Sequence, residues 1–402
     1  MNPADQSELR QPLWFLVLFA MAAGGGAIAY VPLLTVLLPL KVTALLGTED
    51  VPSLAGVTFF GAIVASLANI AFGMVSDRSG SRLPWVVAGL VSSSAVLLMI
   101  GEAESLPMLV ALVMVWQMCL NMMLSPLLAW AGDCVPDSQK GLLGGMLAAA
   151  PAMGALSGSL VTFESLVAPG YRLPTVIALV ALLVLPVVLA GRGRARGQLM
   201  QPTERPRSDS TEQRKSRAIV SRMWLARFLV QISEAGLFAF LLYWLRSIAL
   251  DFHENTAANI FSAVLVVSVP LSLLVGRWSD RHERPILPLV CCAVIAAAGL
   301  SLMATAAELP LAIMGYVVFG IAASIFLSLH TGQTLRVLPL QQHRGRDLGL
   351  FNLTNTIPSI VMPWLTLSLV PGFGFSALFV LFASLALLAA VLLATIPSRM
   401  KA

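Results

Sequence analysis

Three residues within one apolar stretch could carry ionic chemistry inside a membrane. Glu234 lies near the middle of a predicted helix over 223–245, and Arg227 and Gln231 precede it by seven and three residues. At about 100° per residue, these spacings place all three side chains on one helical face. Burial favours a neutral carboxyl group and a nearby cation favours a charged one, so solvent access could switch its protonation. The stripe predicts proton coupling at Glu234 with Arg227 as its partner; a permanently neutral or paired structural glutamate is the alternative.

Other polar and aromatic side chains in apolar stretches are candidates for contacting a solute. Amide and hydroxyl groups recur at helical spacing in the stretches 106–131, 309–335 and 348–370, and an aromatic ring could stack on a solute ring. Such side chains also join helices by hydrogen bonds, so helix packing stays an alternative. The candidate solute-binding residues are Tyr30, Trp116, Gln117, Asn121, Gln231, Tyr316, Ser328, Asn352 and Asn355.

A glycine triplet, Gly24 to Gly26, precedes Tyr30 and Pro32 in the first apolar stretch. Transporters place binding sites at interrupted helices near the middle of the membrane. The triplet therefore indicates a flexible or broken helix, with close helix packing as an equal alternative. We interpret His330, in a later stretch, as a hydrogen-bonded helix residue.

Composition sets the elements that must hold these residues. Apolar residues make up 58% of the 402 residues and charged residues 11%, far from ordinary soluble domains. A bilayer-spanning helix needs about 20 apolar residues, and we expect twelve transmembrane helices in an all-α integral membrane protein. The predicted spans are 13–40, 51–73, 83–100, 106–131, 141–163, 174–190, 223–245, 255–276, 286–303, 309–335, 348–370 and 373–396.

Several function classes find no support in the sequence. No ATP-binding loop, metalloprotease helix or nucleophile elbow occurs, so we expect no enzyme and no cofactor. The four cysteines show neither a disulfide framework nor zinc spacing, and we expect no metal. Energy for any transport must then come from an ion gradient.

The basic residues predict orientation. With the N-terminus in the cytoplasm, 21 of the 25 Lys and Arg residues lie on the cytoplasmic side, as the positive-inside rule requires. We expect a multi-pass inner-membrane protein with both termini in the cytoplasm. The stretch 191–222 is rich in Arg, Ser and Gln and is predicted to be a linker that rests on anionic lipid headgroups.

The chain repeats itself. GMVSDRSGSR at 73–82 and GRWSDRHER at 276–284 each lie between two predicted spans, and their Gly, Ser, Asp and Arg residues are offset by 203 positions. A second pair of landmarks, Lys140-Gly141 and Arg344-Gly345, is offset by 204 positions. Two halves of six spans each are therefore predicted, related as parallel repeats.

The first of these loops resembles the signature loop of the major facilitator superfamily. Ser81 departs from that pattern, and the second copy lacks the internal glycine. The resemblance covers the whole chain through span count and repeat. It implies two pseudo-symmetric six-helix bundles, 1–190 and 223–402, in a secondary transporter that works by alternating access.

The resemblance also implies roles for the loop residues. Asp77 would face the start of the eleventh helix and Asp280 the start of the fifth, because a helix N-terminus attracts a carboxylate. Asp133 is a candidate partner for Arg78 or Arg82. A capped hairpin without a gating role is the alternative. The expected gating residues are Gly73, Asp77, Arg78, Gly80, Arg82, Asp133, Gly276, Asp280 and Arg281.

The stretches 227–247 and 344–363 resemble the sucrose and glycoside-cation symporter branches of the superfamily. They imply symport of a sugar-like polar solute with a proton or sodium ion. Proton-driven efflux of amphipathic compounds is the first alternative, because AAAPAMGA at 148–155 resembles the fifth-helix signature of drug antiporters. A non-transporting receptor or assembly factor is the second. We expect a monomer that binds lipids and no nucleic acid.

Overall fold

The structure is a computed structural model that describes residues 11–48, 50–135, 143, 146–147, 149–190, 210–282, 284–337 and 344–396. At 210–218, 280, 331–337, 344–353 and 355–356 only the backbone is described. Every regular element in these ranges is a helix, which agrees with the expected all-α class. The chain divides into unit 1, Met1–Gln201 with Glu254–Ser262, and unit 2, Pro202–His253 with Ala263–Ala402.

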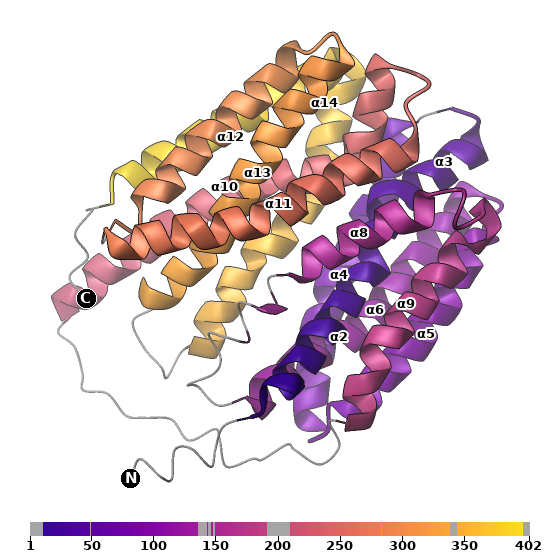
Figure 1. Cartoon of the computed structure of the whole chain (residues 1–402), viewed down its shortest axis with the longest axis horizontal. Coiled ribbons are helices and arrows are strands. Elements are labelled where there is room, and N and C mark those ends of the chain that lie inside the picture. The colour runs from indigo at the N-terminus through magenta and orange to yellow at the C-terminus, as the bar shows by residue number, and fades with distance from the viewer. Residues whose placement is uncertain are drawn as a thin grey trace. The chain divides into compact units, whose positions relative to one another are not determined.

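Unit 1 is built from long apolar helices joined by short turns (Figure 1). Five of them have proline at the first or second position, where a helix tolerates its missing N–H. The helices of unit 1 are α2 (Leu13–Pro32), α3 (Leu38–Leu46), α4 (Val51–Arg78), α5 (Leu83–Gly101), α6 (Leu106–Cys134), α8 (Ala150–Thr162) and α9 (Arg172–Ala190).

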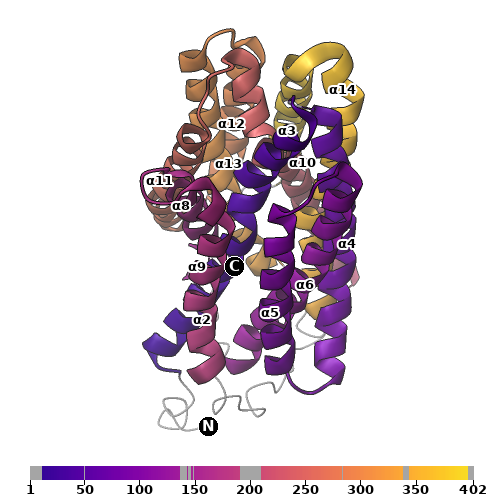
Figure 2. The same ribbon diagram turned by 90° about the vertical axis from the view of Figure 1, so that its right-hand side faces the viewer.

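Within unit 1, α4 and α5 pack on α6, and α2 packs on α8 and α9. Figure 2 shows α4, α5 and α6 side by side. Gly89 lets α5 approach the backbone of α6, because a Cβ atom at this position would lie 2.7 Å from Cα of Met123. Such close approach at small residues is how membrane helices gain packing without a hydrophobic driving force.

The glycine triplet in α2 serves packing. The helix runs through Gly24 and Gly26 without interruption. A Cβ atom at Gly24 would lie 2.5 Å from the thioether of Met153, and one at Gly26 would lie 2.5 Å from Leu124. The irregularity of this span comes after Pro32, where a π-helical turn, Leu33–Leu37, leads into α3. The structure thus favours close packing at the triplet over a break there.

Unit 2 contains α10 (Ser210–Ile248), most of α11 (Glu254–Arg281), α12 (Leu287–Thr305), α13 (Leu309–Val337) and α14 (Arg344–Ala394). Helix α12 packs on α13 and α14, and α10 packs on α13 and α14. Gly299 of α12 approaches the backbone of α13 as Gly89 approaches α6, since its Cβ would lie 2.5 Å from the amide nitrogen of Phe319. The third and fourth spans of each half thus meet at a glycine.

Ten helices in the described part of the chain are long and apolar enough to cross a membrane, against twelve expected spans. Two differences account for this. Helix α8, in the fifth expected span, has 13 residues. The eleventh and twelfth expected spans both lie in α14, which Gly374 interrupts with a φ of 71° and a ψ of 178°. The left-handed φ suits glycine, and Pro371 precedes it.

Helix α10 begins earlier than expected. The sequence predicts a start at Met223 and a linker over 191–222, but the backbone is helical from Ser210. The sequence Ser-Thr-Glu-Gln at 210–213 matches a capping box, and the Arg and Lys residues that follow have high helix propensity. Apolar runs do not predict this segment as a helix, because its residues are mostly polar.

The first nine residues of α11 belong to unit 1. Arg172, at the start of α9, pairs with Glu254 at 3.2 Å and with Glu164 at 3.5 Å. Asn255 donates to the carbonyl of Ser159 and to the hydroxyl of Thr162 at the end of α8.

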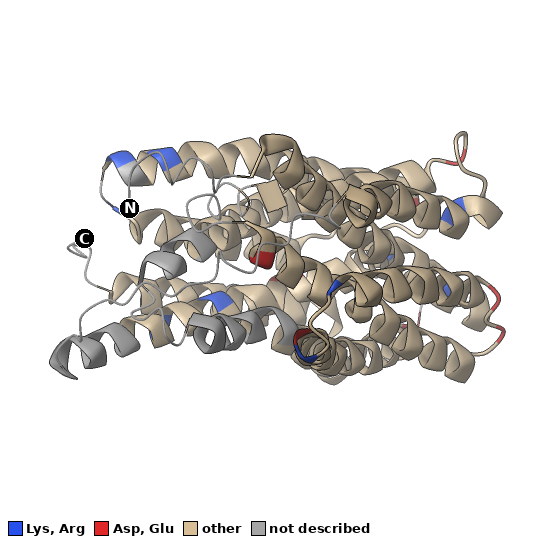
Figure 3. Ribbon diagram, turned by 90° about the horizontal axis from the view of Figure 1, so that it is seen from below, with Lys and Arg blue, Asp and Glu red and all other residues tan. Residues whose placement is uncertain are grey.

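Charged residues elsewhere are sparse along the helices and gather toward helix ends and loops (Figure 3). The middle parts of the spans are therefore apolar and suited to contact lipid.

Candidate functional site

The polar stripe predicted on α10 is present in unit 2. Gln231 donates from Nε2 to a carboxylate oxygen of Glu234, three residues along the same helix. Arg227 is 8% exposed, and its charge is close enough to that of Glu234 for the two to interact. The structure therefore places a carboxyl group, an amide and a guanidinium on one face inside an apolar helix, as the spacing predicted.

Helices α13 and α14 hold Arg227 in place. Its Nε donates to the hydroxyl of Thr354 at 3.2 Å, and its Nη1 donates to the carbonyl of Leu327 at 3.0 Å. These bonds join three helices at one guanidinium. Because a charge buried in an apolar span needs partners, this anchoring makes Arg227 a fixed cation. Sequence reasoning missed Thr354, whose polar type in an apolar span was the available signal.

Two further residues of α13 border the stripe. Tyr316 is 3% exposed and lies within electrostatic range of Glu234. His330 is fully buried, and its Nε2 lies 2.9 Å from the carbonyl of Met223, which agrees with a hydrogen-bonded helix residue. Two buried side-chain oxygens of α10, Oε1 of Gln231 and Oγ of Ser233, have no hydrogen-bond partner among the described residues.

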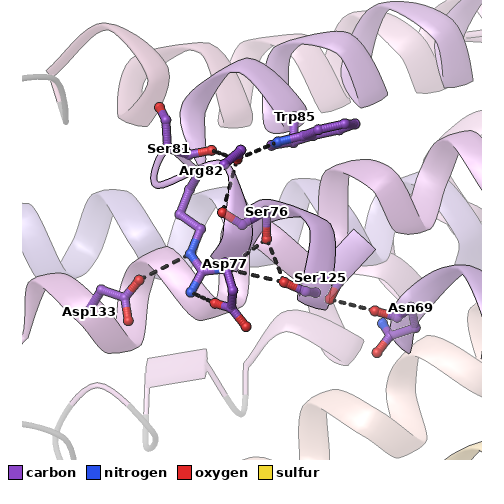
Figure 4. Close-up of polar contacts among 10 residues, drawn as sticks. Asn69, Ser76, Asp77, Ser81, Arg82, Trp85, Ser125 and Asp133 are labelled. Atoms are coloured by element: carbon purple, nitrogen blue, oxygen red, sulfur yellow. Dashed lines mark hydrogen bonds and ion pairs between the residues drawn. The ribbon is translucent and has the colours of Figure 1, made fainter. Parts of the chain in front are cut away.

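The first signature loop forms an ion-pair cluster in unit 1 (Figure 4). Arg82 pairs with Asp77 and donates from Nε to Asp133 at 3.1 Å. Its Nη1 donates to the hydroxyl of Ser76 at 2.7 Å and to the carbonyl of Gly73 at 3.4 Å. Arg82, and not Arg78, is thus the partner of Asp133. The cluster ties the end of α4 to the start of α5 and the end of α6.

The other loop residues lie as follows. Gly80 has a φ of 66°, which the turn requires and a side chain would strain. Arg78 and Arg281 are exposed, and Gly73 and Gly276 lie in helices, facing Ser125 and Leu329. The side chain of Asp280 and the starts of the fifth and eleventh helices lie outside the described residues. The expected contacts of Asp77 and Asp280 with those helix starts stay predictions.

A second polar seam joins α4 to α6. Asn69 donates from its amide to Oδ1 of Asn121 at 3.1 Å, and Asn121 donates to the carbonyl of Gln117 at 2.9 Å. Ser125 donates to the carbonyl of Asn69 at 2.8 Å. Asn69 was missed by the sequence analysis, although an amide within an apolar span was a usable signal. These contacts support the helix-packing alternative for Asn121.

The remaining candidates are dispersed. Trp116 is fully buried and Gln117 is 8% exposed, both on α6. Tyr30 is half-buried on α2, and Ser328 is exposed on α13. The side chains of Asn352 and Asn355 lie outside the described residues. In unit 2, the structure joins Gln231 to Glu234 by a hydrogen bond.

The described helices are those of a membrane protein, and α10 carries an ionic pair within an apolar span. Residues 223–401 match the model of the Major Facilitator Superfamily. A search of curated proteins by sequence finds no match. The match covers α11 to α14 and most of α10, and it shows that this part of the chain is similar to that superfamily.

Two crystal structures share this fold along nearly the whole chain. One is a bacterial homolog to the human lysosomal transporter Spinster, inward-facing and unoccupied, with 14% identity and a TM-score of 0.65; the match covers 95% of this chain and 94% of that chain. The other is the nucleoside transporter NupG, with 15% identity and a TM-score of 0.67. This match covers 94% of this chain and 99% of that chain.

Proposed function

We propose that this protein is a proton-coupled secondary transporter of a small, hydroxyl-bearing organic solute such as a sugar, working by alternating access. The observation that carries the proposal is the half-buried Glu234 within an apolar span, bonded to Gln231 and near the fixed cation Arg227. An ionisable residue inside a membrane span is costly and therefore marks a functional site. A purely structural role in the span would cost less free energy with an apolar residue at this position.

The mechanism follows from charge balance. Arg227 is anchored to Thr354 and Leu327 and keeps its charge. When Glu234 is ionised, the pair is neutral overall; when Glu234 takes a proton, one positive charge remains uncompensated. The proton therefore changes the electrostatics of the site by a full charge at a fixed place. Such a change can favour exposure of the site to one face of the membrane over the other.

We assign solute contact to Gln231 and Tyr316 in unit 2, and to Tyr30, Trp116 and Gln117 in unit 1, with Ser328, Asn352 and Asn355 as further candidates. Amide and phenol groups suit hydroxyl partners. The fold is also that of a nucleoside transporter, and nucleosides carry sugar hydroxyls. That likeness supports the polar class without fixing the solute.

The signature loops are proposed to gate the cytoplasmic side. Arg82 supports this role, because it holds Asp77 and Asp133 in one cluster at the ends of three helices. Gly73, Arg78, Gly80, Gly276, Asp280 and Arg281 complete the proposed gate. In the same proposal, bundles 1–190 and 223–402 form the two moving halves of a monomer in the inner membrane. Both termini are cytoplasmic, and anionic lipids contact the basic linker.

The test is uptake into proteoliposomes with an imposed pH gradient. A sugar and nucleoside panel is compared with a panel of cationic dyes, for wild type, Glu234→Gln and the control Glu104→Gln. Glu104 is exposed in a loop. We expect gradient-driven accumulation of one hydroxylated solute, lost in Glu234→Gln and kept in Glu104→Gln. Accumulation that survives in Glu234→Gln would refute the coupling role, and transport of dyes alone would favour efflux.

A further inference from the structure

Gln231 has two hydrogen-bonding ends, and only one of them has a partner among the described residues. Its Nε2 donates to Glu234, whereas its Oε1 is buried and receives no hydrogen bond from any described residue. A buried polar atom without a partner costs stability. A side chain kept in this state, beside the charged pair of the site, is suited to bind something else that enters the site.

The charge of Glu234 determines which end of the Gln231 amide stays available for another partner. An ionised carboxylate only accepts hydrogen bonds, so it takes the NH2 end of the amide and leaves the carbonyl end facing away. A neutral carboxyl group carries an O–H donor, which suits the carbonyl end. A half-turn of the amide about its terminal torsion exchanges the two ends and preserves the bond to Glu234.

We propose that Gln231 is a specificity-determining residue whose amide turns when Glu234 gains or loses a proton. It thereby presents a carbonyl group to the solute in one state and an NH2 group in the other. This inference rests on the proposed function and deepens it. The proton is then linked to solute recognition through one hydrogen bond, in addition to the change in net charge.

The neighbours of Glu234 leave this role to Gln231. The charged and titratable groups near the pair of Glu234 and Arg227 are Tyr316 and His330 on α13, and the described part of α14 contributes the hydroxyl of Thr354, which accepts from Arg227. Arg227 is held by α13 and α14, and His330 is bonded to the backbone of α10. Arg227 has donors only. Gln231 alone among these side chains joins Glu234 by an amide that can reverse its polarity.

The switch selects a class of solute. A hydroxyl group both donates and accepts, so it can pair with Gln231 in either protonation state. An ether or fluorine at the same position cannot donate, and it would pair only with the NH2 end, in the protonated state. A hydroxyl at the contacting position is therefore what permits a solute to stay bound while the proton arrives or leaves.

Infrared spectroscopy of the full-length protein in lipid nanodiscs tests the switch without any solute. The probe is the proton, supplied by a pH titration. Glutamine is labelled with carbon-13 at its side-chain carbonyl, and the Gln231 band is identified by its loss in Gln231→Leu. The band of the neutral Glu234 carboxyl group is identified by its loss in Glu234→Gln, and the band of Gln117, in unit 1, serves as the control.

We expect the Gln231 band to shift with the same midpoint as the Glu234 carboxyl band and to lose its pH response in Glu234→Gln, while the Gln117 band stays constant. A Glu234 band that titrates while the Gln231 band stays constant would overturn the switch and leave the proposed function standing. A Glu234 carboxyl group that shows no titration at any pH where the protein is folded would overturn both.

Discussion

The cluster around Arg82 makes a prediction that a native cysteine can report. Cys134 follows Asp133 directly, ends α6 and is fully buried. Arg82 holds this helix end through the bond to Asp133 at 3.1 Å. Replacing Arg82 with Gln removes the ion pairs and leaves a side chain too short to span the cluster. We expect the end of α6 to open more often and to expose the thiol of Cys134.

The magnitude follows from the exposure of each partner. The Asp77 side chain is 63% exposed, and such a pair contributes about 0–1 kcal/mol. The Asp133 side chain is 31% exposed, and its charged hydrogen bond contributes about 1–2 kcal/mol after allowance for solvent. The bond from Arg82 to Ser76 is also lost, but the Ser76 hydroxyl keeps its own bond to the carbonyl of Gly73 at 2.9 Å, so this loss adds little. The sum is about 2 kcal/mol, or about a 30-fold rise in the open population.

The assay is maleimide labelling of the folded protein, with each cysteine followed separately by peptide mass spectrometry. Arg78→Gln is the matched control, because Arg78 is exposed in the same loop and forms no ion pair with a described residue. The exposed Cys291, in unit 2, is the internal reference. We expect Cys134 to react about 30-fold faster in Arg82→Gln only. A rate within twofold of wild type would show that the cluster does not hold the helix end.

Three further predictions concern the gate and the packing of unit 1. Asp77→Asn should leave membrane insertion intact but impair solute uptake; normal uptake rates would contradict a gating role. Gly89→Ala should lower the free energy of unfolding by about 1–3 kcal/mol, because the added Cβ would meet the backbone of α6. The control Gly56→Ala, whose Cβ would lie in open space, should have no such effect. Equal melting temperatures of the two variants would refute the packing argument. Glu254→Gln should lower the free energy of unfolding by about 1 kcal/mol. Glu164→Gln, whose side chain is 71% exposed, should have no measurable effect. The reverse order in thermal unfolding would show that burial does not rank the two ion pairs of Arg172.

The amino-acid sequence determined the class of fold and the stripe on α10. Span length depends on runs of apolar residues, and the common face of Arg227, Gln231 and Glu234 depends only on their spacing along one helix. The duplicated loop was visible because a repeat keeps residue types in order. These features are local, so neighbours in space were not needed to find them.

Tertiary structure decided which partners these residues take. The sequence offered Arg78 and Arg82 equally to Asp133, and the turn at Gly80 directs Arg82 to it. The sequence offered Asn121 as a solute contact, and the packing of α4 against α6 gives it Asn69 as a hydrogen-bond partner. Each choice depends on helices that are distant in the chain and meet only after folding, because a hydrogen bond or ion pair requires atoms within about 3 Å.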